Sequence, residues 1–280
     1  MHFEEKAENL KKRMNRYAKG DVAVAFSGGV DSSLLLNLAA AASEEHGTKV
    51  YAILMHTMLH SARDAKEAKA AAKEAGAEFR MLTVDELLEA GILDNPKDRC
   101  YRCKKYLFEQ LKRESESLGA AVILEGTNED DLHGYRPGLL AVKELGIRSP
   151  LADAGFTKEE VRRFAEELGI SASKKPSMPC LATRFPYGTR LSYEDIRKAE
   201  QGEQFIRAMG FYNVRLRVHG DIARIEVDTE GFGEIMGRRK EIISYLKNLG
   251  YSYVTLDMEG FRSGSMDINI DQQKMGTDAR

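Results

Sequence analysis

Short apolar runs alternate with amphipathic or alanine-rich segments between residue 21 and about residue 180. The runs predict strands, because strands buried on both faces are continuously apolar, and the longer segments between them predict helices. The expected strands are 21–26, 50–55, 79–84 and 121–124, and the expected helices are 32–44, 61–76 and 99–116. This order predicts an α/β fold whose parallel sheet is covered on both faces.

A further helix is expected at 157–168. Thr157 and Glu160 form a capping box at its start, and Gly169 follows its end. Helical spacing predicts that its apolar face consists of Val161, Phe164, Ala165 and Leu168.

The pattern changes after about Pro186. A helix is expected at 192–209, followed by two segments in which apolar and polar positions alternate, 214–218 and 222–227. The short turn between these two segments predicts a hairpin. A helix at 234–249 and a strand at 253–258 complete the pattern. We therefore expect two domains, an α/β domain at residues 1–185 and a smaller α+β domain at residues 186–280.

Composition excludes several classes of protein. Hydrophobic residues make up 42% of the 280 residues and charged residues 31%, as in globular proteins with a sizeable core. The net charge of −2 provides no overall field that would attract nucleic acid or a membrane surface. Residues 1–20 lack the apolar centre of a signal peptide, and no apolar run approaches the ~20 residues that span a bilayer. We expect a cytoplasmic protein with no nucleic-acid or membrane partner.

One glycine-rich loop carries the strongest chemical signal. It lies between a predicted strand and a predicted helix and consists of Ser27, Gly28, Gly29, Val30, Asp31, Ser32 and Ser33. Two glycines allow a tight turn, so that backbone N–H groups and the helix N-terminus face one anion. Asp31 would repel a phosphate unless a cation lies between them, which assigns it to Mg²⁺ or to ordering the loop. The Gly-Lys-Ser/Thr of a Walker loop is absent.

This loop resembles the SGGxDS loop of the PP-loop ATP pyrophosphatases, which cleave ATP to AMP and pyrophosphate. The resemblance implies an adenine nucleotide alpha hydrolase-like fold, ATP and Mg²⁺, with the site at the carboxyl ends of the strands. Further ATP-binding residues would be Met55 at the adenine, Gly126 and Thr127 after the fourth strand, and Arg136 at a phosphate. The alternative for residues 125–131 is a plain turn rich in Asn and Asp.

The three cysteines are too few for a disulfide scaffold. Cys100 and Cys103 lie at the start of a predicted helix, after a candidate N-cap, Asp98, and a helix N-terminus lowers the pKa of a thiol. Nearby cations act in the same direction, and here they are Arg99, Arg102, Lys104 and Lys105. Cys180 lies in a proline-containing segment, 176–186, that predicts a loop.

Three interpretations of the cysteines compete. Structural zinc would need a fourth ligand, such as His133, and the second Cys or His pair of such sites is missing. A redox Cys-x-x-Cys pair would be expected in a thioredoxin-like context. A [4Fe-4S] cluster with three cysteine ligands has one open iron, which can bind an additional sulfide.

Five segments together resemble the LarE family of ATP-dependent sulfur transferases, between about residue 5 and residue 266. They are SGGVDSS, DRCYRCKK, EGTNEDD, KPSMPCLATRFPYG and RLRVHGDIARIEV. The resemblance implies adenylation of a carboxylate of pyridinium-3,5-biscarboxylic acid mononucleotide and its conversion to a thiocarboxylate, in nickel-pincer cofactor biosynthesis. It also implies a homo-oligomer.

Within that family, this chain resembles the three-cysteine members. The resemblance implies that Cys100, Cys103 and Cys180 are catalytic and hold a [4Fe-4S] cluster charged by sulfide or a sulfur-donor protein, with Asp31 also catalytic. In single-cysteine members the residue matching Cys180 gives up its own sulfur. Other possible functions are a tRNA thiolase, for which a basic surface and extra cysteines are missing, and a non-catalytic nucleotide-binding iron–sulfur protein.

The predicted hairpin supplies a candidate substrate site. Alternation places Arg215 and Arg217 on one face of the first strand, and Arg224 and Glu226 on one face of the second. Guanidinium groups bind phosphate or carboxylate bidentately, so we expect these residues, with Arg184 from the Cys180 segment, to bind the substrate. The alternative is a solvated charged sheet face.

Overall fold

The computed structural model describes residues 2–59, 62–133, 136–175, 180–262 and 264–266. The chain divides into two compact units, one formed by Met1–Ile92 with Pro96–Ser177 and the other by Leu93–Asn95 with Met178–Arg280. Most of the second unit thus follows Met178, and the unit also contains Leu93–Asn95 from much earlier in the chain. Separate roles for an α/β and an α+β domain stay a prediction.

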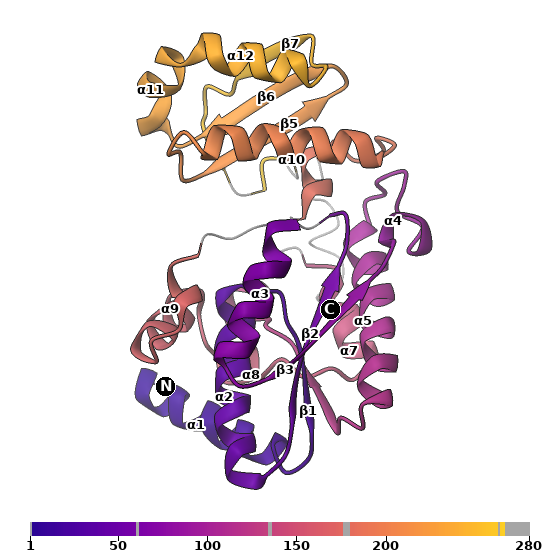
Figure 1. Cartoon of the computed structure of the whole chain (residues 1–280), viewed down its shortest axis with the longest axis vertical. Helices are drawn as coiled ribbons and strands as arrows, with labels where there is room; N and C mark the ends of the chain where they lie inside the picture. The colour runs from indigo at the N-terminus through magenta and orange to yellow at the C-terminus, as the bar shows by residue number, and fades with distance from the viewer. Residues whose placement is uncertain (1, 60–61, 134–135, 176–179, 263, 267–280) are drawn as a thin grey trace, which may run out of the picture. The chain divides into compact units, whose positions relative to one another are not determined.

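The first unit contains a parallel sheet of four strands, at the positions that the apolar runs predict. The strands are β1 (Val22–Ala25), β2 (Val50–His56), β3 (Glu78–Thr83) and β4 (Val122–Leu124), in the order β3-β2-β1-β4. The chain therefore leaves β1 toward β2 on one side, and later returns to place β4 on the other side of β1. Figure 1 shows this sheet in the centre of the unit.

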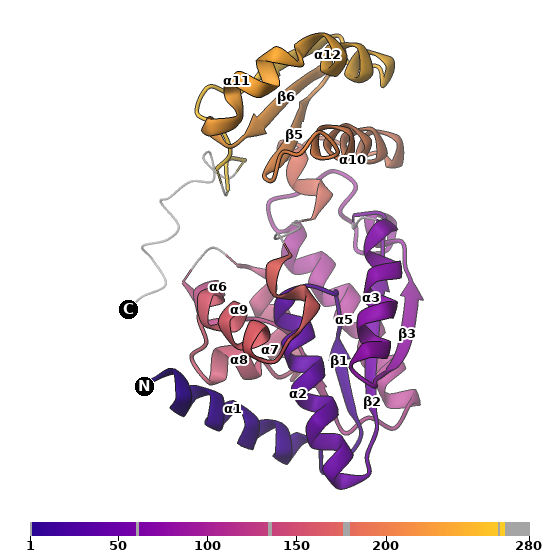
Figure 2. The same cartoon turned by 60° about the vertical axis from the view of Figure 1, so that its left-hand side comes forward.

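Helices cover both faces of this sheet, as the α/β prediction requires (Figures 1 and 2). Val22 and Val24 belong to the core on one face, whereas Ala23 belongs to the core on the other. The first face is covered by α1 (Phe3–Tyr17), α2 (Val30–His46), α3 (Ala62–Glu74), α8 (Pro150–Asp153) and α9 (Lys158–Glu167). The second face is covered by α5 (Arg99–Ser117) and α7 (Gly138–Glu144).

Local signals predicted some helix ends and missed others. The capping box of Thr157 and Glu160 is present at the start of α9. Leu168, expected on the buried face, is 45% exposed because it lies at the C-cap, where the chain leaves the helix. Helix α1 was not expected, and neither were the short elements α4 (Glu86–Glu89), α6 (Glu129–Leu132), α7, α8 and η1 (Ser171–Lys174).

The second unit contains a three-stranded sheet in the order β5-β6-β7. Strands β5 (Val214–His219) and β6 (Ile222–Val227) form the predicted antiparallel hairpin, and β7 (Tyr253–Leu256) pairs in parallel with β6. Helix α10 (Tyr193–Arg207) is also at its predicted position. Short 3-10 turns lie at η2 (Leu181–Arg184) and η3 (Thr229–Gly231).

The single helix expected at 234–249 is two helices, α11 (Phe232–Gly237) and α12 (Arg239–Asn248). Arg238 interrupts them with φ −94° and ψ 9°, directly after Gly237, whose low helix propensity favours an end at this point. Across the residues that the structure describes, none of the helices has the length and apolar character needed to cross a bilayer.

We expect Gly202→Ala to destabilise the second unit. A Cβ added at Gly202 of α10 would lie 2.6 Å from a methyl carbon of Leu216 and 2.9 Å from one of Leu246, and both leucines are fully buried. Overpacking costs about 1–3 kcal/mol and outweighs the roughly 1 kcal/mol that alanine gains over glycine in a helix. Because both contacts are shorter than 3.0 Å, the upper part of that overpacking range, about 2–3 kcal/mol, applies, and the free energy of unfolding in urea should fall by about 1–2 kcal/mol.

Gly233→Ala is the matched control, because nothing lies within 4 Å of the Cβ that it would add in α11. This control should leave stability unchanged or raise it. A Gly202→Ala protein as stable as the wild type would contradict the close packing of α10 on β5 and α12.

Candidate functional site

The glycine-rich loop connects β1 to α2 and is shaped for a close turn. Gly28 has φ +73°, a conformation that glycine adopts without strain, and a Cβ there would lie 3.3 Å from the Cβ of Ala68 in α3. Gly29 is the N-cap of α2, so the first turn of the helix follows at once. The N–H groups of a first helical turn, with the positive end of the helix dipole, form an anion site at this point.

The loop serines differ in their surroundings. The Ser27 and Ser32 hydroxyls lie 3.1 Å apart, and the Ser32 hydroxyl donates to the Gly29 carbonyl at 3.2 Å. Ser33 is buried, and within the described residues its hydroxyl has no hydrogen-bond partner. It lines a cavity of about 90 Å³ together with residues of α2, α3 and the 168–171 segment. Ser27 and Ser32 thus order the loop itself.

Asp31 lies where two loops meet at the ends of β1 and β4. A Cβ on Gly126 would lie 3.0 Å from the Cβ of Asp31, so the chain after β4 packs directly against the first turn of α2. The Asn128 amide donates to one carboxylate oxygen of Asp31 at 3.0 Å, and the Lys158 ammonium donates to the other. Asn128 belongs to the 125–131 segment that the sequence placed near the nucleotide, but sequence reasoning gave neither residue as a partner of Asp31. Lys158 gave no signal beyond its place in the first turn of a predicted helix.

This position is the point at which the strand order reverses, because β1 has β2 on one side and β4 on the other. Ligands of open α/β sheets bind in the crevice that such a reversal opens at the carboxyl ends of the strands. The structure brings the 27–33 loop and Gly126 together there, and half-buried Met55 lies near the end of the adjacent strand β2.

Two other predicted ATP residues have partners within the protein. Thr127 is buried and donates both its N–H and its hydroxyl to Glu125, at 3.1 and 2.9 Å. Arg136 is exposed and forms an ion pair with Asp131 at 2.7 Å. Thr127 therefore orders the loop after β4, and Arg136 would have to leave Asp131 to reach a phosphate.

The Cys-x-x-Cys pair lies at the expected helix start. Helix α5 begins at Arg99, with Asp98 as N-cap, although the Asp98 side chain forms no cap hydrogen bond and accepts from Arg102 instead, at 2.8 Å. Cys100 is exposed and Cys103 is half-buried. Two nearby lysines pair with carboxylates as well, Lys104 with Glu125 at 3.2 Å and Lys105 with Glu144 at 3.0 Å.

Cys180 is half-buried and precedes the 3-10 turn η2. Its carbonyl accepts hydrogen bonds from the Thr183 N–H at 3.1 Å, the Thr183 hydroxyl at 2.8 Å and the Arg184 guanidinium at 3.3 Å. Residues 176–179 of the predicted loop lie outside the described residues. None of the three cysteines is in a disulfide.

The donor chemistry of three thiols fits an iron–sulfur cluster with one open iron. In the part of the chain that the structure describes, however, no three Asp, Glu, His or Cys side chains are grouped so as to hold a metal ion. The cluster, and cysteine ligation with it, stays a prediction.

Arg184 is fixed by a buried ion pair. Its guanidinium donates to both carboxylate oxygens of Glu203 in α10, at 2.7 and 3.0 Å. Glu203 also accepts from the Leu216 N–H at 2.9 Å and from Arg207 at 2.8 Å, and it was not singled out from the sequence. Arg184 therefore ties the Cys180 turn to α10 and β5, a positioning contact that its prediction as a substrate residue did not include.

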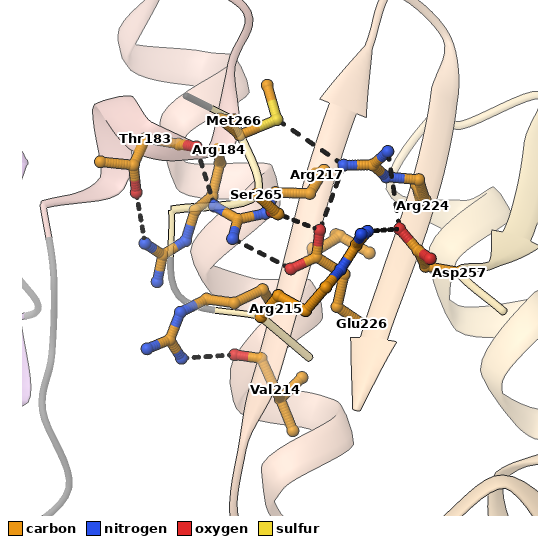
Figure 3. Close-up of polar contacts among 12 residues, drawn as sticks. Thr183, Arg184, Val214, Arg215, Arg217, Arg224, Glu226, Asp257, Ser265 and Met266 are labelled. Atoms are coloured by element: carbon orange, nitrogen blue, oxygen red, sulfur yellow. Dashed lines mark hydrogen bonds and ion pairs between the residues drawn. The ribbon is translucent and has the colours of Figure 1, made fainter. Parts of the chain in front are cut away.

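Arg215, Arg217 and Glu226 of the hairpin are buried and Arg224 is half-buried, so the alternative of a solvated charged face is wrong. Arg215 lies opposite Glu226, and Arg217 lies opposite Arg224. Glu226 accepts from Arg217 at 2.9 Å, from Arg224 at 3.1 Å and from Ser265 at 2.7 Å, as Figure 3 shows.

This cluster consists of Arg215, Arg217 and Arg224 with Glu226 and with Asp257, which pairs with Arg224 at 3.6 Å. Its three guanidinium groups outnumber its two carboxylates. Burial, together with the charge of Arg184, lowers the pKa of Arg215 to about 10, so that its guanidinium is still charged at neutral pH. Burial, with the charges of Arg224 and Arg217, also lowers the pKa of His219. Among the described residues, the Nε–H groups of Arg217 and Arg224 have no hydrogen-bond partner. A bound anion would satisfy such donors.

We expect Glu203→Gln to lower the free energy of unfolding at neutral pH and to make that free energy depend less on pH in the acidic range. Burial raises the pKa of the Glu203 carboxyl, but Arg184 and Arg207 outweigh burial and hold that pKa below its ordinary value. The ion pair therefore contributes in full above the ordinary pKa of about 4.3 and is lost as pH falls through the lower folded-state value. Breaking a buried pair costs about 3–5 kcal/mol at neutral pH.

Urea unfolding at neutral pH and at several acidic pH values measures both effects. Glu200→Gln, one turn earlier on α10, should behave like the wild type. If the Glu203→Gln protein were as stable as the wild type at neutral pH, the ion pair of Glu203 with Arg184 would not be what holds the turn after Cys180.

Comparisons with known proteins agree with this geometry. A model of the PP-loop domain matches residues 2–134. The pyridinium-3,5-bisthiocarboxylic acid mononucleotide synthase of Lactiplantibacillus plantarum is 37% identical over 91% of this chain and 92% of its own. An uncharacterized protein of Synechocystis sp. is 34% identical over 95% of this chain and 98% of its own, and one of Methanocaldococcus jannaschii is 33% identical over 94% and 100%. Similarity over nearly the whole length, with the phosphate loop at the strand-order reversal, shows that the chain belongs to the LarE family of PP-loop proteins.

Proposed function

We propose that this protein uses ATP to adenylate a carboxylate of pyridinium-3,5-biscarboxylic acid mononucleotide and then replaces the activated oxygen with sulfur. The product is the thiocarboxylate of nickel-pincer cofactor biosynthesis. The observation that carries the proposal is the 27–33 loop at the strand-order reversal, with Asp31 facing the chain after β4, in a member of the LarE family.

The first step takes place on the phosphates of ATP. A carboxylate oxygen of the substrate attacks the α-phosphorus, and pyrophosphate leaves, which gives an acyl-adenylate. The backbone N–H groups of the loop and the N-terminus of α2 stabilise the leaving pyrophosphate. Mg²⁺ is held in such sites by one or two carboxylates together with phosphate oxygens, and Asp31 is a carboxylate of this kind. Gly126 lets the chain after β4 approach this loop, and we assign Met55, half-buried near the end of β2, to the adenine.

The arginine face of the hairpin binds the anionic part of the substrate. Arg217 and Arg224 donate to Glu226, whose two oxygens are already occupied by protein donors. Arg215 lies opposite Glu226 in the hairpin, and its guanidinium donates to the Val214 carbonyl at 2.7 Å. The excess positive charge and the unpaired Nε–H donors among the described residues support an additional anion there. Arg184 acts indirectly on the substrate, because it binds the Cys180 carbonyl and Glu203 and so holds the turn after Cys180 in place.

The second step exchanges oxygen for sulfur. A sulfide attacks the acyl carbon, AMP leaves with the activated oxygen, and the thiocarboxylate remains. We assign Cys100, Cys103 and Cys180 as the ligands of a [4Fe-4S] cluster, which when bound supplies a transferable sulfide at its open iron. Each turnover would consume one sulfide, which would have to be supplied as free sulfide or by a sulfur-donor protein with a reductant. Self-association of the chain is a further part of this proposal.

Asp31→Asn tests the ATP half of the proposal. It removes the single carboxylate of the 27–33 loop, and the loss of such charge stabilisation costs about 10²–10³ in rate. We expect AMP formation in the presence of substrate to fall by at least about 100-fold, measured by chromatography of the nucleotides. Asp21→Asn, at the opposite end of β1, is the control and should keep full activity. Full activity in Asp31→Asn would rule out the assigned role.

Cysteine substitutions test the sulfur half. We expect Cys100→Ser, Cys103→Ser and Cys180→Ser each to lose the iron–sulfur absorption of anaerobically reconstituted protein, as well as turnover beyond one equivalent with added sulfide. A sacrificial cysteine predicts a different pattern, in which Cys180 loses the mass of H₂S, about 34 Da, because only the attacking thiol gives up its sulfur. That mass loss, together with an active Cys100→Ser protein, would contradict ligation by three cysteines.

A further inference from the structure

The ammonium of Lys158, at the start of α9, contacts Asp31 of the phosphate loop. The ATP site described above gives this lysine no role. Its ammonium donates to Asp31, while the Asn128 amide takes the other oxygen of the same carboxylate. Each Asp31 oxygen therefore has one protein donor and a lone pair left for a cation. A Mg²⁺ ion bound there would lie beside the Lys158 ammonium, the charged donor at this carboxylate, and would repel it.

The backbone of Lys158 is fixed although its side chain reaches across to another element. Its N–H donates to Asp130 at 2.8 Å, and the preceding residue, Thr157, is the N-cap of α9 in a capping box with Glu160. The Glu129 N–H donates to the Phe156 carbonyl at 2.7 Å, which ties the same segment to the chain after β4. Only the flexible four-carbon stem is left to move, and its ammonium has three rotatable donors.

The charges decide where the ammonium goes. When Mg²⁺ arrives with the nucleotide, it neutralises Asp31 and repels the neighbouring ammonium. The Lys158 side chain is 35% exposed and that of Asp31 is 19% exposed, so the ion pair is not sealed in the core. The nearby Asp130 carboxylate already accepts from the Lys158 N–H, whereas the phosphate oxygens of a nucleotide in the loop would be new, multiply charged acceptors for the ammonium. A small rotation of the stem exchanges a carboxylate partner for a phosphate partner.

We propose that Lys158 is a phosphate-binding residue, held against Asp31 until a magnesium-bearing nucleotide displaces it onto the pyrophosphate group. This inference rests on the proposed ATP site. It assigns Lys158 two successive partners: in the empty loop it compensates the charge of Asp31, and in the loaded loop it compensates the charge of the leaving group.

Calorimetric binding of magnesium pyrophosphate, with AMP as the comparison ligand, tests this role. Lys158→Met should weaken pyrophosphate binding about tenfold or more, because a charge-assisted hydrogen bond is lost, and should leave AMP binding within about twofold. Lys174→Met is the matched control, since Lys174 lies on the nearby η1 turn, is 84% exposed and pairs with Glu166. It should bind both ligands like the wild type. Lys158→Gln, which keeps a polar side chain, replaces Lys158→Met if that variant does not fold.

A second comparison separates phosphate binding from mere support of Asp31. In a protein that already carries Asp31→Asn the ion pair is gone, so a supporting lysine would give no further change in pyrophosphate affinity when it is replaced. A phosphate-binding lysine still gives a loss of about tenfold in that background. No further loss there, or wild-type affinity in Lys158→Met, overturns the proposal. A wild-type protein that binds neither ATP nor pyrophosphate contradicts the proposed function itself.

Discussion

The close approach of the chain after β4 to the first turn of α2 is the constraint on which the nucleotide half of the molecule depends. Gly126 has no room for a side chain next to Asp31, so the two loops lie in direct contact. This contact brings the Asn128 amide to the Asp31 carboxylate. The hydrogen bond from the Lys158 N–H to Asp130 holds the start of α9 beside the same loop, so that the Lys158 ammonium also reaches Asp31. A carboxylate so close to a helix N-terminus would oppose phosphate binding, and the two donors compensate it while the loop is empty.

In the second unit the charged groups near the proposed substrate site are buried or half-buried arginines paired with carboxylates. This unit packs arginines against three carboxylates, Glu203, Glu226 and Asp257, each of which pairs with two arginines. Replacing buried ion pairs with apolar residues is often neutral or stabilising, so stability alone does not explain such a cluster. An excess of guanidinium groups over carboxylates does make sense where an anion is to be bound, and one of these pairs also fixes the backbone of the Cys180 turn.

Much of the fold could be predicted from local patterns. The strands of both sheets follow from apolar runs and strict alternation, and α9 begins where its capping box predicts. Predictions failed where a local signal was weak. The helix expected at 234–249 breaks at Arg238, and α1 carries so many charges that its buried stripe of Ala7, Leu10 and Met14 was not recognised. Leu168 has the right spacing for a core position but lies beyond the last helical turn.

The sequence by itself determined the chemistry available to this protein: the phosphate loop, the cysteine spacing and the alternating arginines are local, because each depends on neighbours within a few residues. Tertiary structure decided which of these groups face one another. Lys158 is 127 positions from Asp31, and Glu203 is 19 from Arg184. No periodicity relates such partners, because their approach follows from the order of strands and the packing of helices. The same packing buries most of the alternating arginines, for which the sequence had left a solvated sheet face as the alternative.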